Sequence, residues 1–243
     1  MLKPILVALT AIIMSGCANV PAEKQDERDP LQSLNRPIYD FNMDVLDTYI
    51  LRPVTVGYVE VTPQSVRTGL VNFTTNLTAP TDAINAGLQG KPSSMGVNVA
   101  RFLVNSTVGI LGLFDVATSL GLEHQDEDFG QTLGVWGVGD GAYLMLPGMG
   151  PSTARNLTGD IVDNYALPEI ALSTPQTLAL FAIKAIEARA SLMAQEKLLE
   201  ESLDPYIFVK DVYFQRQLYE LYDGNPPIKE EPTDFDEDFL ENL

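Results

Sequence analysis

Cys17 is the residue with the clearest reactive chemistry, because a thiol can be acylated and the chain holds no second cysteine. It directly follows Ser15 and Gly16, which come after an apolar run over residues 5–14 and a single positive residue, Lys3. A positive residue, a short apolar run and small residues in this order are typical of a secretory signal. Small residues immediately before a cysteine are also what acyl transfer to the thiol and cleavage on its N-terminal side require.

This pattern predicts a signal peptide over residues 1–16 and a lipidated tether over residues 17–28. The apolar run is shorter than the roughly 20 residues that a permanent membrane-spanning helix needs. Acylation would hold the protein on a membrane and would account for a lone cysteine in an exported chain. Because Ala18 is not the aspartate that retains bacterial lipoproteins at the inner membrane, we expect the outer membrane as destination. Ordinary cleavage after Ala22 is the alternative.

His124 and its acidic neighbours are the second group of residues with chemistry to consider. His124 is the only histidine, so a metal site built from several histidines is excluded. Nearby carboxylates could bind a hard cation, but their spacing does not follow the EF-hand loop. A solvated acidic loop is the favoured interpretation. The neighbours are Glu123, Asp126, Glu127 and Asp128.

Two glycine-containing motifs give no support for catalysis. The segment Gly137-Val-Gly-Asp-Gly141 lacks both the Lys-Ser/Thr pair of a phosphate loop and the dinucleotide-binding spacing. Ser152 lacks the flanking glycine that the G-x-S-x-G motif requires. The sequence therefore predicts a protein that is not an enzyme and that has no catalytic residue, cofactor or metal.

The charge balance is strongly acidic, with a formal net charge of -18 and 45% apolar residues. Nucleic acid as a partner is excluded, because affinity for phosphate backbones depends on clustered Lys and Arg. Residues 230–243 hold seven acidic residues and no basic one, so we expect residues 225–243 to form a disordered acidic tail. Both a solvated tail without function and a docking tail for a basic partner remain open.

Prolines just inside polar caps mark the predicted helix starts. The chain shows no sustained period-2 alternation and no Asn-Gly hairpin signal. We therefore expect a mostly α fold of short to medium helices with no sizeable sheet, in one domain over residues 29–224. The predicted helices cover residues 36–49, 62–73, 79–90, 91–106 and 174–200.

A long apolar stretch over residues 102–122 carries a single charged residue, Asp115. Its length is close to that of a spanning helix, but its glycines and polar residues argue against simple insertion. Two interpretations remain: a buried pair of helices in the core, or a pair lying in or dipping into one leaflet. The candidate membrane-embedded residues are Phe102, Leu103, Val108, Ile110, Leu111, Leu113 and Phe114.

A second stretch, residues 130–150, contains seven glycines interleaved with aromatic and aliphatic residues. Glycine packs helices closely and frees the backbone to bend. The stretch therefore predicts an apolar, irregular wall. Its candidate residues are Gly130, Gly134, Trp136, Gly137, Gly139, Gly141, Tyr143, Leu144 and Leu146.

Motifs spread over nearly the whole chain resemble the MlaA (VacJ) family of outer-membrane lipoproteins. Two positions depart from the family pattern. Asn156 stands where the family often has Asp. Lys210 stands where the family often has Arg, and lysine keeps the charge but lacks the planar guanidinium with its fork of donors. These departures put local contacts in doubt. The motifs that carry the resemblance are Asp29-Pro30-Leu31, Asn35-Arg36, Tyr39 with Phe41-Asn42, Arg52-Pro53-Val54, Asn72-Phe73, Leu88-Gln89-Gly90, Arg101-Phe102, Asn105-Ser106-Thr107, Phe114-Asp115-Val116-Ala117, Asp128-Phe129-Gly130-Gln131, Asp204-Pro205-Tyr206 and Tyr213-Phe214-Gln215-Arg216.

The resemblance implies a ring-shaped assembly of helices embedded in one membrane leaflet, on the periplasmic side of the outer membrane and beside a trimeric porin. It implies an amphipathic channel that removes mislocalised phospholipids from the outer leaflet. A soluble periplasmic carrier (MlaC-like) would return them to the inner membrane, which maintains lipid asymmetry. Residues 130–150 would then form channel wall or a mobile loop. The alternatives are a lipoprotein that scaffolds a porin or envelope complex without conducting lipid, and a lipid hydrolase.

Overall fold

The computed structural model describes residues 26–165 and 174–227. The predicted signal peptide, the thiol of Cys17 and the acidic residues from 228 onward lie outside these ranges. The predictions made for them, and for the domain boundaries, stay predictions.

Helices dominate the described residues, and one two-stranded sheet is present. The strands are antiparallel, with Tyr143 opposite Thr153 and Leu146 opposite Gly150. In chain order the elements are α2 (Gln32–Asp40), the π-helical η2 (Phe41–Leu51), α3 (Arg52–Val61), α4 (Gln64–Leu88), α5 (Pro92–Thr107), α6 (Val116–Ser119), α7 (Phe129–Val135), β1 (Tyr143–Leu146), β2 (Gly150–Thr153), α8 (Ala154–Tyr165), α9 (Thr174–Leu192), the 3-10 segment η3 (Met193–Gln195), α10 (Glu196–Glu200) and α11 (Pro205–Leu221).

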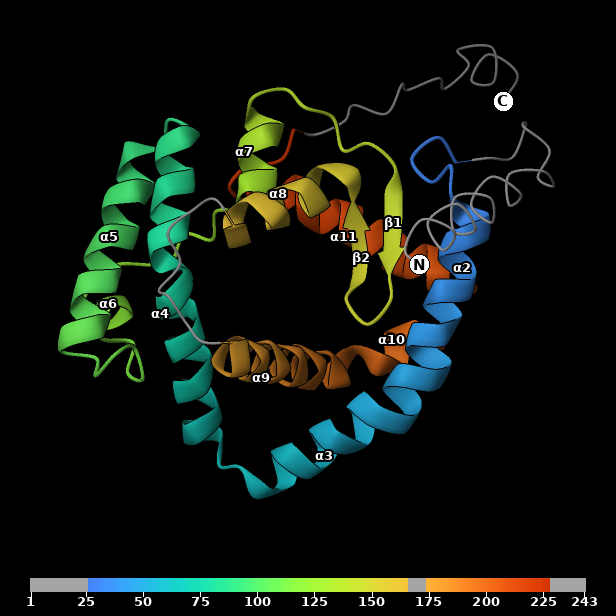
Figure 1. Ribbon diagram of the computed structural model, residues 1–243, viewed down its shortest axis with the longest axis horizontal. Coiled ribbons are helices and arrows are strands. Elements are labelled where there is room, and N and C mark those ends of the chain that lie inside the picture. The colour runs from blue at the N-terminus through green and yellow to red at the C-terminus, as the bar shows by residue number, and fades with distance from the viewer. Residues whose placement is uncertain (1–25, 166–173, 228–243) are drawn as a thin grey trace, which may run out of the picture.

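The elements follow one another around a common centre (Figure 1). Helices α2, η2 and α3 form one side, α4 forms the opposite side, and α7, α8, α11 and the β1–β2 hairpin complete the circuit. Helix α5 packs along the outer side of α4, and α9 contacts both α3 and α4. The predicted ring-shaped, mostly α fold without a sizeable sheet is confirmed.

Proline placement explains several helix starts and one wrong prediction. Pro92 lies in the first turn of α5, and Pro205 lies in the first turn of α11, which Asp204 caps by accepting from the N–H groups of Tyr206 and Ile207. The predicted break at residues 79–80 is wrong, because α4 runs through Pro80 for 25 residues. Proline removes one backbone donor, but the packing of α4 along α5 keeps the helix continuous.

The predicted start at Pro37 is also wrong, since α2 begins at Gln32 and encloses that proline. The pair of helices expected over residues 102–122 is absent from the described structure. Helix α5 ends at Thr107, a run of turns follows, and α6 is a single turn of four residues. Within these turns Gly112 has a positive φ of 89°, a conformation that glycine adopts without steric cost.

Polar side chains fill the interior of the described structure and apolar side chains lie outside. Buried polar or charged side chains number 19 against 8 buried apolar ones, while 35 large apolar side chains are exposed. In an ordinary globular domain the fully buried positions are mostly apolar. Here the ring is held together inside by hydrogen bonds and ion pairs.

One small apolar core joins α2, β1 and α11. Tyr39, Tyr143, Met145 and Tyr206 form it, and the rings of Tyr39 and Tyr206 pack edge to face with centroids 5.6 Å apart. This core fixes the hairpin between the first and last described helices.

Within the described residues, no helix combines the length and the apolar character that crossing a membrane requires.

Candidate functional site

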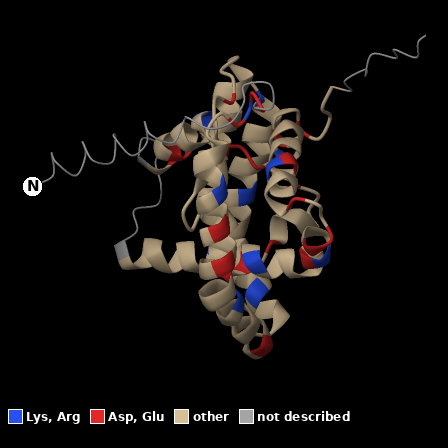
Figure 2. Cartoon of the chain, turned by 90° about the vertical axis from the view of Figure 1, so that its right-hand side faces the viewer, with Lys and Arg blue, Asp and Glu red and all other residues tan. Residues whose placement is uncertain are grey.

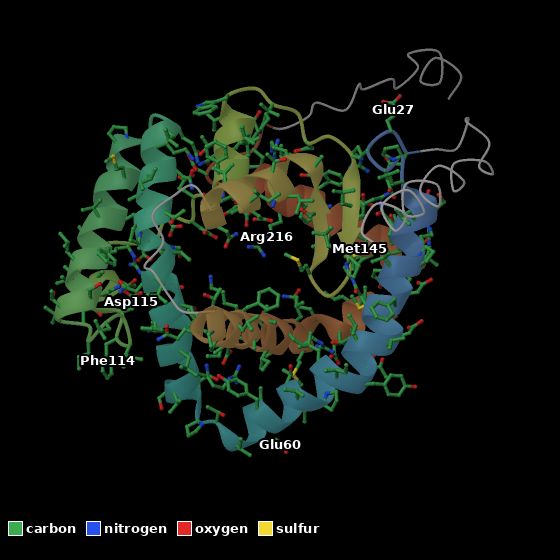
Figure 3. All side chains as sticks on the ribbon, viewed as in Figure 1. Glu27, Glu60, Phe114, Asp115, Met145 and Arg216 are labelled. Atoms are coloured by element: carbon green, nitrogen blue, oxygen red, sulfur yellow. The ribbon has the colours of Figure 1, made fainter. Side chains whose placement is uncertain are left out.

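Residues 108–114, here called the apolar loop, gather exposed apolar side chains at the outer edge of the ring. Val108 is 67% exposed and Leu111 is 64% exposed. Figure 3 shows Phe114 pointing away from the body beyond α6. Of the candidate membrane-embedded residues, all are exposed except Phe102, which is half-buried. The exposed ones are Leu103, Val108, Ile110, Leu111, Leu113 and Phe114.

The backbone of the apolar loop satisfies most of its N–H donors by hydrogen bonds to nearby carbonyls. Six of its seven N–H groups donate to carbonyls of residues 104–110, including Gly112 N to Asn105 O at 2.7 Å and Phe114 N to Gly109 O at 2.9 Å. Ile110 and Leu111 adopt positive φ angles of 53° and 57°, which is uncommon for branched residues. The loop therefore has a defined shape that exposes apolar side chains without leaving many backbone donors free.

A polar network under the apolar loop holds that shape. Arg101 donates to Asp115 at 2.9 Å and to the Thr118 hydroxyl at 2.8 Å, and Asn105 donates to the other Asp115 oxygen at 3.0 Å. Asn105 also accepts from the Ala117 N–H at 2.9 Å. Burial alone would raise the pKa of Asp115, but the hydrogen bonds from Thr118, Arg101 and Asn105 lower it to about 2. Asp115 therefore stays charged and keeps α5 joined to α6.

Two asparagines bind the edge of β1 that has no strand neighbour. Asn35 donates to the Tyr143 carbonyl at 2.9 Å and accepts from the Met145 N–H at 2.9 Å. Asn42 donates to the Leu146 carbonyl at 2.9 Å and accepts from a backbone N–H of the following turn. Since β2 pairs with the other edge, the side chains of α2 and η2 take the place of a third strand.

A cavity of about 310 Å³ lies between the hairpin, α8 and α11. Arg216, one of its lining residues, points from α11 toward the centre of the ring in Figure 3. Four carboxylates and one guanidinium line the cavity together with neutral hydrogen-bonding groups. The lining residues are Asp126, Asp128, Pro151, Ser152, Asn156, Asp160, Tyr213, Arg216, Gln217 and Glu220.

The electrostatics of this cavity are acidic. Burial, with the neighbouring charges of Asp163, Asp126 and Asp160, raises the pKa of Asp128 to about 6. Arg216 forms an ion pair with Glu220 at 2.6 Å, one turn away on α11. In the part of the chain that the structure describes, no group of three or more His, Cys, Asp or Glu residues is arranged to hold a metal ion. The cavity can therefore offer hydrogen bonds and charge to a polar group, without a metal centre built from these residues.

The residues predicted from the glycine-rich stretch do not come together at this cavity. None of them is among its lining residues. Gly130 is buried against α8, and Tyr143 is fully buried in the apolar core. Trp136 is 56% exposed and donates to the Leu88 carbonyl at 3.1 Å. Gly137, Gly139 and Gly141 are exposed, and Gly134, Leu144 and Leu146 are half-buried. Their place in a channel wall stays a prediction.

His124 joins the loop before α7 to α4. Its Nε2 lies 3.0 Å from Asp82 Oδ2, and Asp82 is 4% exposed. Burial raises the pKa of Asp82 to about 6, while the hydrogen bond and charge of His124 act in the opposite direction. The only histidine of the chain is thus used in a contact between α4 and the acidic loop.

The first half of α9 stands away from the body of the ring and carries no charged residue (Figure 2). Leu178 and Phe181 are exposed there. Two contacts hold the second half: Arg189 donates to Asp47 at 2.6 Å, and Glu187 accepts from Arg67 at 2.9 Å. Helix α9 therefore has an anchored end and an uncharged projecting end.

The sequence reasoning did not predict this cavity: it assigned Asp126 and Asp128 to a solvated acidic loop and gave no cavity role to the other lining residues. Asp126 and Asp128 precede α7, Asp160 lies on α8, and Arg216 lies on α11, so only the fold brings them together. Of the two departures from the family pattern, Asn156 donates to the Tyr213 hydroxyl at 2.9 Å, and Lys210 is buried with two acidic partners.

The fold and the site define a class of helical ring protein with a polar, charged interior and an apolar exterior. A family model described as MlaA lipoprotein matches residues 27–220. The chain therefore belongs to the MlaA lipoprotein family, which confirms the resemblance found in its motifs.

Relatives in this family align over most of the chain. The Escherichia coli (strain K12) protein named intermembrane phospholipid transport system lipoprotein MlaA is 39% identical over 230 residues, 93% of this chain and 92% of its own length. The Haemophilus influenzae protein of the same name is 34% identical over 249 residues, which cover 99% of this chain and 98% of its own length. A solved structure, described as the structural basis for maintenance of bacterial outer membrane lipid asymmetry, matches with a TM-score of 0.75 at 41% identity, over 79% of this chain and 98% of its own.

Proposed function

We propose that this protein is an outer-membrane lipoprotein that transports phospholipid. It removes mislocalised phospholipids from the outer leaflet through its ring and passes them to a soluble periplasmic carrier for return to the inner membrane. Lipid asymmetry of the outer membrane is thereby maintained. The names of the Escherichia coli and Haemophilus influenzae relatives support phospholipid as the substrate. The observation that carries the mechanism is the inverted polarity of the ring, with charged groups around its cavity and apolar groups outside.

A phospholipid moving through such a ring must keep its head group hydrated and its acyl chains away from water. Transfer of a charged head group into an apolar medium is costly unless hydrogen bonds replace its water. Arg216 and the neutral groups of Ser152 and Gln217 offer such hydrogen bonds along one wall of the cavity. This arrangement supports passage of the head group on the side of α8 and α11.

We infer that the apolar loop and its neighbours are embedded in the leaflet from the periplasmic side. In hydrocarbon every backbone polar group must be satisfied within the protein, because no water is present. The apolar loop meets this requirement for its donors, because six of its seven N–H groups are bonded to nearby carbonyls. Its exposed side chains carry no charge. We also expect a trimeric porin as a partner, and it would cover part of this edge.

The hydrolase alternative has little support. His124 is engaged with Asp82, and the relatives are named as transport lipoproteins. We therefore retain the prediction that the protein is not an enzyme. The scaffold alternative differs in one testable respect, because a protein that only holds a porin or envelope complex does not need an open cavity.

The test is the phospholipid content of the outer leaflet in a strain that lacks this gene. Wild-type protein should clear surface phospholipid, while Cys17→Ala should not, because the anchor is lost. Asp160→Trp, which places a bulky ring in the cavity, should also fail, with Asp160→Asn as its matched control. Unchanged surface phospholipid in the deletion strain would refute transport. Full clearance by Asp160→Trp would favour the scaffold.

A further inference from the structure

A buried ion cluster joins the first described residues of the chain to α11. Asp29 is fully buried, and its Oδ2 accepts from the Tyr206 hydroxyl at 2.6 Å and lies 3.3 Å from Lys210 Nζ. Lys210 is 3% exposed and also lies 2.8 Å from Asp26. Burying such charges costs free energy unless each one is paired and hydrogen-bonded, as these are. We call this group the Asp29–Lys210 cluster.

Asn35 connects this cluster to the hairpin. Its Nδ2 donates to Asp29 Oδ1 at 2.8 Å and to the Tyr143 carbonyl at 2.9 Å, while its Oδ1 accepts from the Met145 N–H at 2.9 Å. The side chain is 1% exposed. One amide thus uses both of its hydrogens and its oxygen in a closed set of contacts.

Asp29 and the two backbone groups of β1 favour the same orientation of this amide. An ionised carboxylate only accepts hydrogen bonds, so the NH₂ end of Asn35 must face it. The same rotamer then presents the second hydrogen to the Tyr143 carbonyl and the oxygen to the Met145 N–H. Lys210 lies 3.3 Å from this carboxylate and forms an ion pair with it.

The chain of contacts from Asp29 through Asn35 continues from β1 to the cavity. Tyr143 N–H donates to the Arg28 carbonyl at 3.0 Å, so the start of the described chain also holds β1 through its backbone. Strand β1 pairs with β2, and Pro151 and Ser152 of β2 line the cavity of about 310 Å³. A shift of Asn35 therefore moves the hairpin that forms one wall of the cavity.

We propose that Asp29 and Asn35 are positioning residues for the transport cavity, with Lys210 holding Asp29 in place through their ion pair. The inference rests on the proposed function only for its effect on lipid movement. The Asp29–Lys210 cluster holds the side chain of Asn35 in place, Asn35 holds β1, and the hairpin forms one wall of the cavity. The residues that follow the predicted lipid tether are thereby coupled to the site that handles the lipid.

The test measures hydrogen exchange at the Met145 amide in the full chain, together with clearance of surface phospholipid in cells. Asp29→Asn preserves size but removes the charge, and Asn35→Leu removes the connecting amide. Both should accelerate Met145 exchange by about tenfold or more and reduce lipid clearance. Lys210→Arg keeps the charge and should behave like wild type in both measurements, whereas Lys210→Met should follow Asp29→Asn.

Asn98→Leu is the matched control. Asn98 is also fully buried, and it likewise donates to the carbonyl and accepts from the N–H of one backbone segment, at Gln125, away from the hairpin. It should lose similar stability while leaving Met145 exchange and lipid clearance unchanged. Wild-type Met145 exchange in folded Asp29→Asn would overturn the proposal, and so would equal acceleration in Asn98→Leu. Failure of wild type itself to clear lipid would refute the proposed function alone, since the exchange result still decides the positioning role.

Discussion

The side chain of Asn42 holds the hairpin turn at Gly148. Gly148 N–H donates to Asn42 Oδ1 at 2.8 Å, and Asn42 Nδ2 donates to the Leu146 carbonyl at 2.9 Å. Gly148 has a positive φ of 71°, so the turn depends on glycine at the position that Asn42 binds. Asn42 follows Asn35 by seven residues, close to two helical turns, and both therefore face β1.

We predict that Asn42→Leu destabilises the protein by about 1–3 kcal/mol, because two backbone groups of the turn lose their partner. The Gly148 amide should exchange faster with solvent, whereas amides of α4 and α5 should not change. Urea unfolding and residue-resolved hydrogen exchange measure the two effects. Asn225→Leu, at an exposed asparagine after α11, provides the surface control. Normal protection of the Gly148 amide from exchange in Asn42→Leu would show that the turn keeps its conformation without Asn42.

Local sequence signals identified the helices whose starts depend on local chemistry. Pro92 and Pro175 stand in the first turns of α5 and α9, where the missing N–H of proline has no helical partner to lose. Pro80 gave a wrong prediction because packing along α5 carries α4 through it, and packing between distant segments leaves no local signal. The apolar loop was expected to be helical for the same reason, since its turns depend on the network beneath it.

The hairpin and the cavity could not be predicted from the sequence. Strand β1 is stabilised on one edge by side chains about 100 positions earlier in the chain, so its own residues show no strand pattern. The turn Pro147-Gly148 was the one local signal available. The acidic residues of the cavity do not stand out individually in a chain with 33 Asp and Glu. Only family resemblance pointed to a ring.

Asp128 should make stability depend on pH. Its pKa in the folded protein is raised to about 6 by burial, so between about pH 4 and pH 6 the folded state binds more protons than the unfolded state. Stability is therefore lost as pH rises through this window. Asp128→Asn removes the charge but keeps the cap, because asparagine can also accept from the Gln131 N–H.

We expect Asp128→Asn to be more stable than wild type at neutral pH, by an amount that grows by about 1 kcal/mol between pH 5 and pH 7.5. Urea titrations of both proteins at the two pH values measure the difference. Asp44→Asn, which also removes a carboxylate but from an exposed side chain, is the control. A stability difference that is the same at both pH values would contradict the raised pKa.

Glycines in and around residues 130–150 differ in whether a side chain at their position would have room. A Cβ at Gly159 of α8 would lie 2.3 Å from the Gly130 nitrogen, so these two glycines allow α7 and α8 to touch. A Cβ at Gly139, in the exposed segment before β1, would meet no heavy atom within 4 Å. Gly159→Ala should therefore destabilise by about 1–3 kcal/mol through overpacking, and Gly139→Ala should be near neutral.

Thermal unfolding in detergent measures both variants. Because Gly139 has room for a side chain, Gly139→Trp can then test whether this segment borders the lipid path, with folding confirmed first. Reduced clearance of surface phospholipid by folded Gly139→Trp would support a place in the channel wall. Normal clearance would remove this segment from the path and leave the cavity beside α8 and α11 as the main route.

The apolar loop offers a direct test of its contact with lipid. Leu111 is exposed, and its side chain takes no part in the polar network of Arg101 and Asp115, so Leu111→Glu should change stability in detergent little. A charge in hydrocarbon is costly, by about 2 kcal/mol or more at the centre of a bilayer, so vesicle binding should weaken. Flotation with vesicles of phosphatidylethanolamine and a minority of phosphatidylglycerol measures the binding.

Leu203→Glu is the comparison, because Leu203 is a fully exposed leucine in the connection before α11 and measures the general effect of one added negative charge. Binding lost in Leu111→Glu but kept in Leu203→Glu would place the apolar loop in lipid. Equal binding by both variants would mean that the loop does not enter vesicles by itself. Its apolar side chains would then be free to meet a protein in the membrane, and cross-linking from Val108 to a trimeric porin would be the next measurement.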